Sequence, residues 1–232
     1  MKLTRRRGND YGASAGEDSK STRAARAKEP ATPAEPPAKE PPKPRGFGPY
    51  DVTEAPRGQE VLDLGALRIP AVAGVEVHLQ AGPEGQIQQV QLAHGGSRLQ
   101  VAAFAAPRTE GIWDDIRETL REALVSAGSK PREGEGEYGP ELTARVSEGD
   151  SAVDVRHIGI DGPRWFVHAV YIGAAAVDPD QAGPLRDVLR GLVVDRGVEA
   201  RPVSEGLPLR LPPEAAAQLA AANDGGSSGQ VT

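Results

Sequence analysis

The sequence has no cysteine, few aromatic residues and no long hydrophobic run. Without Cys among the 232 residues, structural disulfides, thiolate metal sites and thiol catalysis are excluded. Aromatic residues are 4% of the chain, too few for the exposed stacking platforms that bind single-stranded nucleic acid. No stretch approaches the ~20 apolar residues of a membrane-spanning helix, and no apolar core follows the basic start of the chain. We therefore expect a soluble cytoplasmic protein that does not contact a membrane.

Charge and proline are concentrated at the start of the chain. Residues 1–45 carry 11 Lys and Arg against 6 Asp and Glu, whereas the remaining residues have a net charge of −11. Nine of the 21 prolines lie within residues 30–56. Such a composition buries too little apolar surface to offset the entropy of ordering, so we expect residues 1–45 to be a disordered, basic and Pro-rich tail. The tail would make weak, salt-dependent contacts with nucleic acid, or serve only as a solubilising spacer.

The longest apolar run, residues 165–172, predicts a central strand. It follows the Gly and Pro chemistry of a tight turn at residues 161–164, and it is apolar on both alternating faces. Such a strand needs helices or another layer over each side of the sheet. Residues 153–160 lead into the turn as the other strand of a hairpin. Their apolar side chains change parity, which predicts a bulge near Arg156 and His157.

Two amphipathic patterns predict helices. The first helix opens at Thr109 and Glu110 and ends at Gly128, and the second starts near Pro184 and ends before Gly197. The carboxylates of the first helix form a cluster of a kind that can be catalytic, but acids early in a helix with bases a turn later are the ordinary pattern of a solvated face, and we adopt that interpretation.

The remaining segments predict strands and connections. Three short strands within residues 75–104 form an antiparallel meander, and residues 142–146 form another short strand. Residues 129–140 show no periodicity and are expected to be a loop. Residues 202–212 are crossed by prolines, so they should run extended over the surface or along a sheet edge.

Hairpins dominate this order of elements, with no regular alternation of strand and helix. The sequence therefore predicts an α+β fold with a mainly antiparallel sheet and two principal packing helices. Residues 46–212 would form a single domain, followed over residues 213–232 by a short Ala-rich helix and a frayed end.

No group of residues has the spacing of a known catalytic or metal site. The four histidines are singles on separate strands and a turn, although folding could bring two together. His168 is expected to be a hydrogen-bonded side chain of the core or edge rather than a ligand. The sequence contains no Gly-x-Ser-x-Gly elbow and no phosphate loop that leads into a helix. It thus predicts no catalytic residue, no metal site and no cofactor.

Two stretches pair an arginine with a tryptophan near the end of an element, where loops carry function. They are PRTEGIW, residues 107–113, and DGPRW, residues 161–165. Five of their residues make up a candidate interaction surface: Arg108, Trp113, Asp161, Arg164 and Trp165. The alternative is that each tryptophan lies in the core and each arginine covers it with its alkyl stem.

Several motifs in order resemble one known family. They include AAPRTEGIWDDIR, GEYGPEL, GIDGPRWFVHAVYIG and GPLRDVLRGLVVDRG. Over residues 48–212 the chain resembles the actinobacterial domain-of-unknown-function family DUF 3710. This resemblance implies cytoplasmic proteins with variable charged tails and no assigned activity, cofactor or catalytic residue. The order of elements is also similar to that of Mog1/PsbP-type α+β sandwiches, which decides no function.

Two classes of function remain open. The first is a non-enzymatic binding or adaptor domain with a protein partner, because the tail suits tethering and the body shows no nucleophile, base and metal together. The second is a small hydrolase or nucleotide-handling enzyme whose Asp, Glu, Arg and His come from distant segments. A deep cleft with convergent ionisable groups would favour the enzyme, and a flat face or shallow groove the binding domain.

Overall fold

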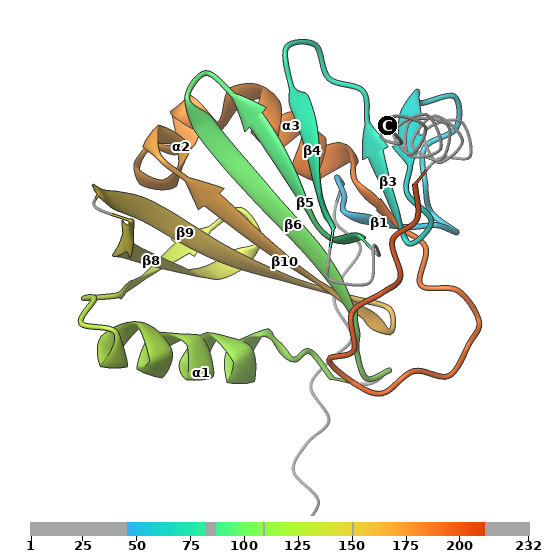
Figure 1. Cartoon of the computed structure of the whole chain (residues 1–232). Coiled ribbons are helices and arrows are strands. Elements are labelled where there is room, and N and C mark those ends of the chain that lie inside the picture. Colours follow the sequence, from blue (N-terminus) through green and yellow to red (C-terminus); the bar gives the residue numbers. More distant parts are fainter. Residues whose placement is uncertain (1–45, 82–86, 109, 150, 212–232) are drawn as a thin grey trace, which may run out of the picture. The chain divides into compact units, whose positions relative to one another are not determined.

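Two β-sheets, with helices over both faces of the larger one, form the described part of the chain (Figure 1). A computed structural model describes residues 46–81, 87–108, 110–149 and 151–211. The expected tail, residues 1–45, and the expected short helix, residues 213–232, lie outside them. The mainly antiparallel pairing and the few helices confirm the predicted α+β fold. That residues 46–212 are a single domain stays a prediction.

The larger sheet has seven antiparallel strands in the order β4-β5-β6-β10-β9-β8-β7. Its strands are β4 (Glu76–Ala81), β5 (Ile87–His94), β6 (Ser97–Ala105), β7 (Arg132–Gly136), β8 (Gly139–Glu148), β9 (Ser151–Gly162) and β10 (Trp165–Ile172). The predicted meander, β4 to β6, and the predicted hairpin of β9 and β10 are both confirmed. Strand β10 lies between β6 and β9, so it is central as expected.

Strand β9 runs through the sheet without a bulge. The predicted bulge near Arg156 and His157 is wrong, because the register with β10 and with β8 is continuous there. Val155 packs in the cluster beneath α1, whereas Ile158 and Ile160 pack in the core on the opposite face. The parity of the apolar side chains changes because the two faces are covered at different points along the strand.

Strand β7 lies within the stretch 129–140, so the prediction of a loop there is wrong. It pairs with β8 at the edge of the sheet, from Arg132 opposite Thr143 to Gly136 opposite Gly139. Its side chains are almost all exposed, so the strand buries no apolar face. The sequence therefore shows no alternation of apolar and polar residues from which this strand could be predicted.

The smaller sheet joins the two ends of the described chain. Its order is β1-β11-β3-β2, with β1 (Tyr50–Asp51) parallel to β11 (Val193–Val194), and β3 (Leu67–Pro70) antiparallel to both β11 and β2 (Val61–Asp63). The second predicted helix is α3 (Gly183–Gly191), preceded by α2 (Ala174–Val177) and a 3-10 turn (Pro179–Ala182). It ends earlier than predicted because its last β-branched residues are used in β11 instead.

Helix α1 (Trp113–Ser126) begins later than the predicted start at Thr109 and Glu110. Its first free amides donate to a carboxylate from another element, Asp161 of β9, at 2.9 Å from Ile112 and 3.4 Å from Trp113. The predicted end at Gly128 is confirmed, because this residue takes a positive φ of 83° and donates to a carbonyl of the last turn.

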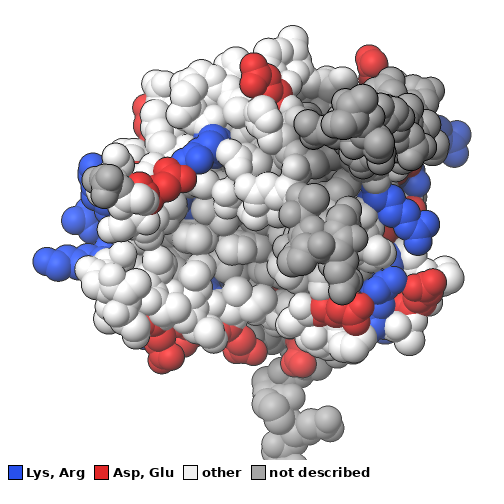
Figure 2. All heavy atoms as spheres, in the orientation of Figure 1, with Lys and Arg blue, Asp and Glu red and all other residues white. Residues whose placement is uncertain are grey.

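Charged side chains of both signs lie mainly around the margin of the face shown in Figure 2. Acidic side chains are prominent along its lower edge, where Figure 1 places α1. The exposed carboxylates of this helix are Asp114, Asp115, Glu118 and Glu122. No helix in the described ranges is long and apolar enough to cross a membrane.

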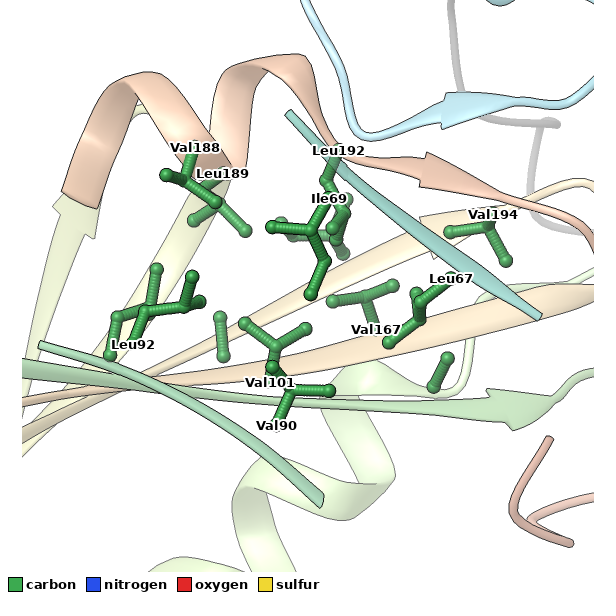
Figure 3. Close-up of a cluster of buried hydrophobic side chains, with 14 of the residues drawn as sticks. Leu67, Ile69, Val90, Leu92, Val101, Val167, Val188, Leu189, Leu192 and Val194 are labelled. Atoms are coloured by element: carbon green, nitrogen blue, oxygen red, sulfur yellow. The ribbon is translucent and has the colours of Figure 1, made fainter. Parts of the chain in front are cut away.

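The main core lies between the larger sheet and a layer made of the smaller sheet and α3 (Figure 3). Its central side chains are Leu67, Ile69, Val90, Leu92, Val101, Val167, Val188, Leu189, Leu192 and Val194. Every second residue of β10 from Trp165 to Tyr171 joins this core, whereas Phe166, Val170 and Ile172 pack on the side of α1. The central strand is therefore covered on both faces, as its sequence predicts.

The extended segment 202–211 fills the place where β5 and β6 diverge. Leu209 bridges Ile87 of β5, and the amide of Leu207 donates to the carbonyl oxygen of Ala103 in β6 at 2.8 Å. Both leucines are buried, which confirms an extended course along strand edges.

Candidate functional site

Both tryptophans of the candidate interaction surface are buried. Trp113 is 4% exposed and Trp165 is 2% exposed. The indole N–H of Trp113 donates to the carbonyl oxygen of Pro140 at 2.6 Å, and that of Trp165 donates to Asp51 Oδ2 at 3.1 Å. The two indoles are thus satisfied inside the molecule and offer no surface to a partner.

A glycine lies beneath each indole. A Cβ built on Gly159 would lie 2.0 Å from Cδ2 of Trp113, and one on Gly162 would lie 2.2 Å from Cε2 of Trp165. Gly162 is needed in the DGPR turn because it makes room for the Trp165 ring. The left-handed backbone conformation of this turn is taken by Arg164, with a φ of 65°, and not by the glycine.

The polar members of the candidate surface are divided between different environments. Asp161 is half-buried and accepts hydrogen bonds from the first amides of α1. Arg164 is half-buried at the turn, and Arg108 is exposed. Because both tryptophans are buried, only Arg108 and Arg164 of the five residues remain as candidates for contact with a partner. That they bind a partner stays a prediction.

A polar cleft of about 350 Å³ lies between the larger sheet and α3. We call it the arginine cleft and define it by its polar lining side chains, Glu135, Glu137, Tyr138, Glu141, Arg156, Tyr171, Arg186 and Arg190. Strands β7 to β10, with the turn after β7, supply the first six, and α3 supplies the last two. Pockets for small molecules begin at roughly 300 Å³, so the cleft can hold a metabolite-sized ligand.

Glu141 and Arg156 form a buried ion pair within the cleft. Their side chains are 8% and 9% exposed, and Arg156 Nη1 lies 3.5 Å from Glu141 Oε2. Arg156 Nη2 also donates to the carbonyl oxygen of Ala175 at 2.7 Å, and its guanidinium lies 4.9 Å from the centre of the Tyr171 ring. Gly136 leaves space for the carboxylate, because a Cβ there would overlap Glu141 Oε1. These contacts fix the guanidinium against the wall of the cleft.

Burial shifts the protonation of two groups in the cleft. Desolvation raises the pKa of the Glu141 carboxyl above its ordinary value, and the neighbouring Arg156 offsets this only in part. Desolvation also raises the pKa of the Tyr171 hydroxyl, which therefore stays protonated at neutral pH and can donate a hydrogen bond.

The rim of the cleft involves the start of the described chain. Arg190 Nε donates to Glu137 Oε1 at 2.6 Å, and the guanidinium of Arg190 lies 5.2 Å from the centre of the Phe47 ring. Phe47 meets Tyr138 edge to face at 5.6 Å, and the Tyr138 hydroxyl donates to the carbonyl oxygen of Gly48 at 3.1 Å. The segment that precedes β1 therefore helps to hold this side of the cleft.

Two of the four histidines meet on the opposite face of the sheet, beneath α1. His157 Nδ1 lies 3.2 Å from His168 Nε2, and their rings stack with centres 5.3 Å apart. Trp113 covers His168, with ring centres 6.1 Å apart. Burial lowers the pKa of both histidines to about 4, so both are neutral at pH 7. This confirms that His168 is a hydrogen-bonded interior side chain.

Other places in the fold are less suited to specific chemistry. A groove of about 720 Å³ lies beside β8 and β9, but its basic side chains, Lys130, Arg132 and Arg145, are exposed and therefore solvated. Across the described ranges, no three side chains of His, Asp or Glu are grouped to hold a metal ion.

Sequence reasoning missed the arginine cleft because its members come from four strands and a helix. One signal was available: Glu141 and Arg156 are charged residues that stand next to apolar strand residues, Glu141 beside Leu142 and Arg156 beside Val155. A buried strand tolerates a charge only when a partner lies within reach, so such residues indicate a buried pair.

Comparisons with known proteins identify a family. The family described as "Protein of unknown function (DUF3710)" matches residues 48–218. This range includes both sheets and the arginine cleft, and it confirms the predicted family. No curated protein and no solved structure matches the chain, so similarity to Mog1/PsbP-type sandwiches stays a prediction. The chain belongs to the DUF3710 family.

Proposed function

We propose that the protein is a non-enzymatic binding domain and that the arginine cleft is its site for a small ligand. The observation that carries this proposal is that the cleft concentrates buried donors while two of its three carboxylates are engaged by arginines, Glu141 by Arg156 and Glu137 by Arg190. No Ser, Thr, His or Asp is among the residues that line it. Such a lining favours recognition over attack on a substrate.

A screen of metabolite-sized compounds tests this function through the melting temperature of the full-length protein. Compounds that bind the cleft should raise the melting temperature of the wild type and raise that of Arg186→Glu much less. Arg57→Glu is the control, because Arg57 is exposed and does not line the cleft. If no compound stabilises the wild type, or if Arg186→Glu responds like the control, the proposal is overturned.

A hydrolytic enzyme is the second candidate, favoured by one observation. The raised pKa of the Glu141 carboxyl is the property expected of a general acid, which must hold its proton near neutral pH. Hydrolysis of p-nitrophenyl acetate or p-nitrophenyl phosphate, measured from pH 5 to pH 8, tests it. Turnover that is lost in Glu141→Gln and kept in Arg57→Glu would establish the enzyme.

A protein partner and a cytoplasmic location are further parts of the proposal. The resemblance to the family implies the location, and cell fractionation tests it. A pull-down from a native lysate with the full-length chain, and with a chain that begins at Gly46, tests the partner. If residues 1–45 contact nucleic acid, capture by the full-length chain should fall steeply between low and physiological salt, since counterion release requires it.

A further inference from the structure

The charges of the arginine cleft leave one arginine without a partner. Arg190 is paired with Glu137 at 2.6 Å, and Arg156 with Glu141 at 3.5 Å. Arg186 lines the same cleft from α3, and no ion pair or hydrogen bond joins it to another residue of the described chain.

Arg186 is not an ordinary solvated side chain. It is half-buried, and its Nε is fully buried without a hydrogen-bond partner in the described ranges. A guanidinium cannot lose its proton in a protein, so this donor stays charged whatever the pH. Buried donors are rarely left unpaired, and an exception of this kind calls for a partner.

Two more unpaired donors lie in the same cleft. Tyr171 is 2% exposed, and its hydroxyl makes no hydrogen bond to any described residue. The Nε of Arg156 is likewise buried without a partner. The guanidinium of Arg156 rests on the Tyr171 ring on the sheet side of the cleft. Arg186 lines the same cleft from α3, and its charge is close enough to act on the pKa of the Tyr171 hydroxyl.

We infer that the ligand of the arginine cleft carries an oxyanion, a carboxylate or a phosphate, which Arg186 binds together with the Tyr171 hydroxyl. This inference rests on the proposed function. An oxyanion is an acceptor with several lone pairs, and arginine with tyrosine supplies the matching charged and neutral donors. Of the unpaired groups that line the cleft, only Glu135 would repel an anion, and it is exposed on the edge strand β7.

The neighbouring carboxylate is compatible with an anionic ligand. Glu141 would oppose an anion in its ionised form, but burial raises the pKa of its carboxyl. Proton uptake by Glu141 would leave the charge of the fixed Arg156 guanidinium uncompensated, and that charge would favour an anion in the cleft. The buried pair therefore does not exclude an oxyanion from the site.

Titration with charged and neutral probes tests the inference on the full-length protein. The probes are inorganic phosphate, phenyl phosphate, succinate and benzoate, and the neutral counterparts are benzamide and succinamide. At least one oxyanion should bind and raise the melting temperature, and its affinity should fall about tenfold or more in Arg186→Gln, because a charge-assisted hydrogen bond is lost. Tyr171→Phe should weaken the same probe several-fold, and Arg57→Gln should not.

The outcomes separate this inference from the proposed function. Binding of benzamide or of a neutral screening compound that depends on the cleft, with no binding of the four oxyanions, would overturn the oxyanion and keep the binding domain. Failure of all probes and all screening compounds would overturn both. An oxyanion that binds equally to Arg186→Gln would place its site elsewhere. Circular dichroism of each variant shows that it is folded, and Tyr171→Phe, which removes only a hydroxyl, gives a second readout.

Discussion

Trp165 is the largest of the fully buried side chains among the described residues, and it contacts both sheets. Its ring lies over Gly162, and its N–H reaches Asp51 of the smaller sheet. Trp165→Ala should lower the free energy of unfolding by roughly 3 to 5 kcal/mol, the usual cost of emptying a large aromatic site. Urea denaturation measures it, with Arg164→Ala as the matched neighbour, which should change stability by no more than about 0.5 kcal/mol. Equal effects of the two substitutions would contradict the buried position of the ring.

The histidine pair predicts a loss of stability in mild acid. The folded state binds protons at His157 and His168 only near pH 4, whereas unfolded histidines bind them near pH 6.5. The pair's full contribution to the free energy of unfolding is therefore present above pH 6.5, and it falls as the pH drops toward 4. Each histidine accounts for up to about 3 kcal/mol of this fall.

Denaturation curves between pH 8 and pH 4.5 check the histidine prediction. His168→Gln should flatten the acid limb, because one of the two shifted groups is removed. His78→Gln is the control, since this histidine is exposed on β4 and lies outside the buried pair. An unchanged acid limb in His168→Gln would show that other groups cause it.

At the scale of elements, two glycines decide whether a tryptophan can lie flat on the sheet. Gly159→Ala would place a Cβ 2.0 Å from Trp113, and backbone and helix α1 must move to accept it. We expect a loss of about 1 to 3 kcal/mol or more, the range for overpacking a filled site. Gly134→Ala in β7 is the matched control, because nothing lies within 4 Å of its Cβ position. Thermal denaturation of both variants measures the difference. If Gly159→Ala lowered the melting temperature as little as Gly134→Ala, helix α1 would be only loosely packed on the sheet.

Periodicity predicted the elements that bury a face and missed those that do not. Strands β4 to β6, β9 and β10 and helices α1 and α3 each present apolar side chains to a core, so their pattern is visible in the sequence. The edge strand β7 buries almost nothing, and the two-residue strands β1 and β11 pair through residues far apart in the chain. Neither property leaves a local pattern.

The candidate site was less predictable than the fold. The two-residue turn between β9 and β10 sets the register that brings His157 diagonal to His168, so this pair could be derived once the hairpin was recognised. The arginine cleft could not, because Arg186 and Tyr171 come to line the same cleft only after α3 has packed on the sheet. Conversely, the two stretches that pair an arginine with a tryptophan were predicted to be an interaction surface, although both tryptophans are buried. The local sequence around a buried tryptophan does not differ from that around an exposed one.

At the scale of the whole molecule, we expect residues 1–45 to be dispensable for stability and the segment from Gly46 to β1 to be required. A chain that begins at Gly46 should keep its melting temperature within about two degrees, because the composition of residues 1–45 predicts that they bury too little apolar surface to contribute to unfolding. A chain that begins at Val52 also loses Phe47, Gly48 and strand β1, which hold the rim of the cleft and the smaller sheet. Differential scanning calorimetry should show this shorter chain melting several degrees lower. A large drop in the first chain would mean that residues 1–45 dock on the body.

The parallel pairing of β1 with β11 has a consequence for synthesis on the ribosome. Tyr50 leaves the exit tunnel long before its partner Val193, because β2 to β10 lie between them in the chain. The smaller sheet therefore cannot close until β11 has emerged, and the apolar face of β3 must wait for α3 and β11 to cover it. High contact order of this kind slows folding, and it leaves apolar surface of the nascent chain exposed to aggregation until β11 is released.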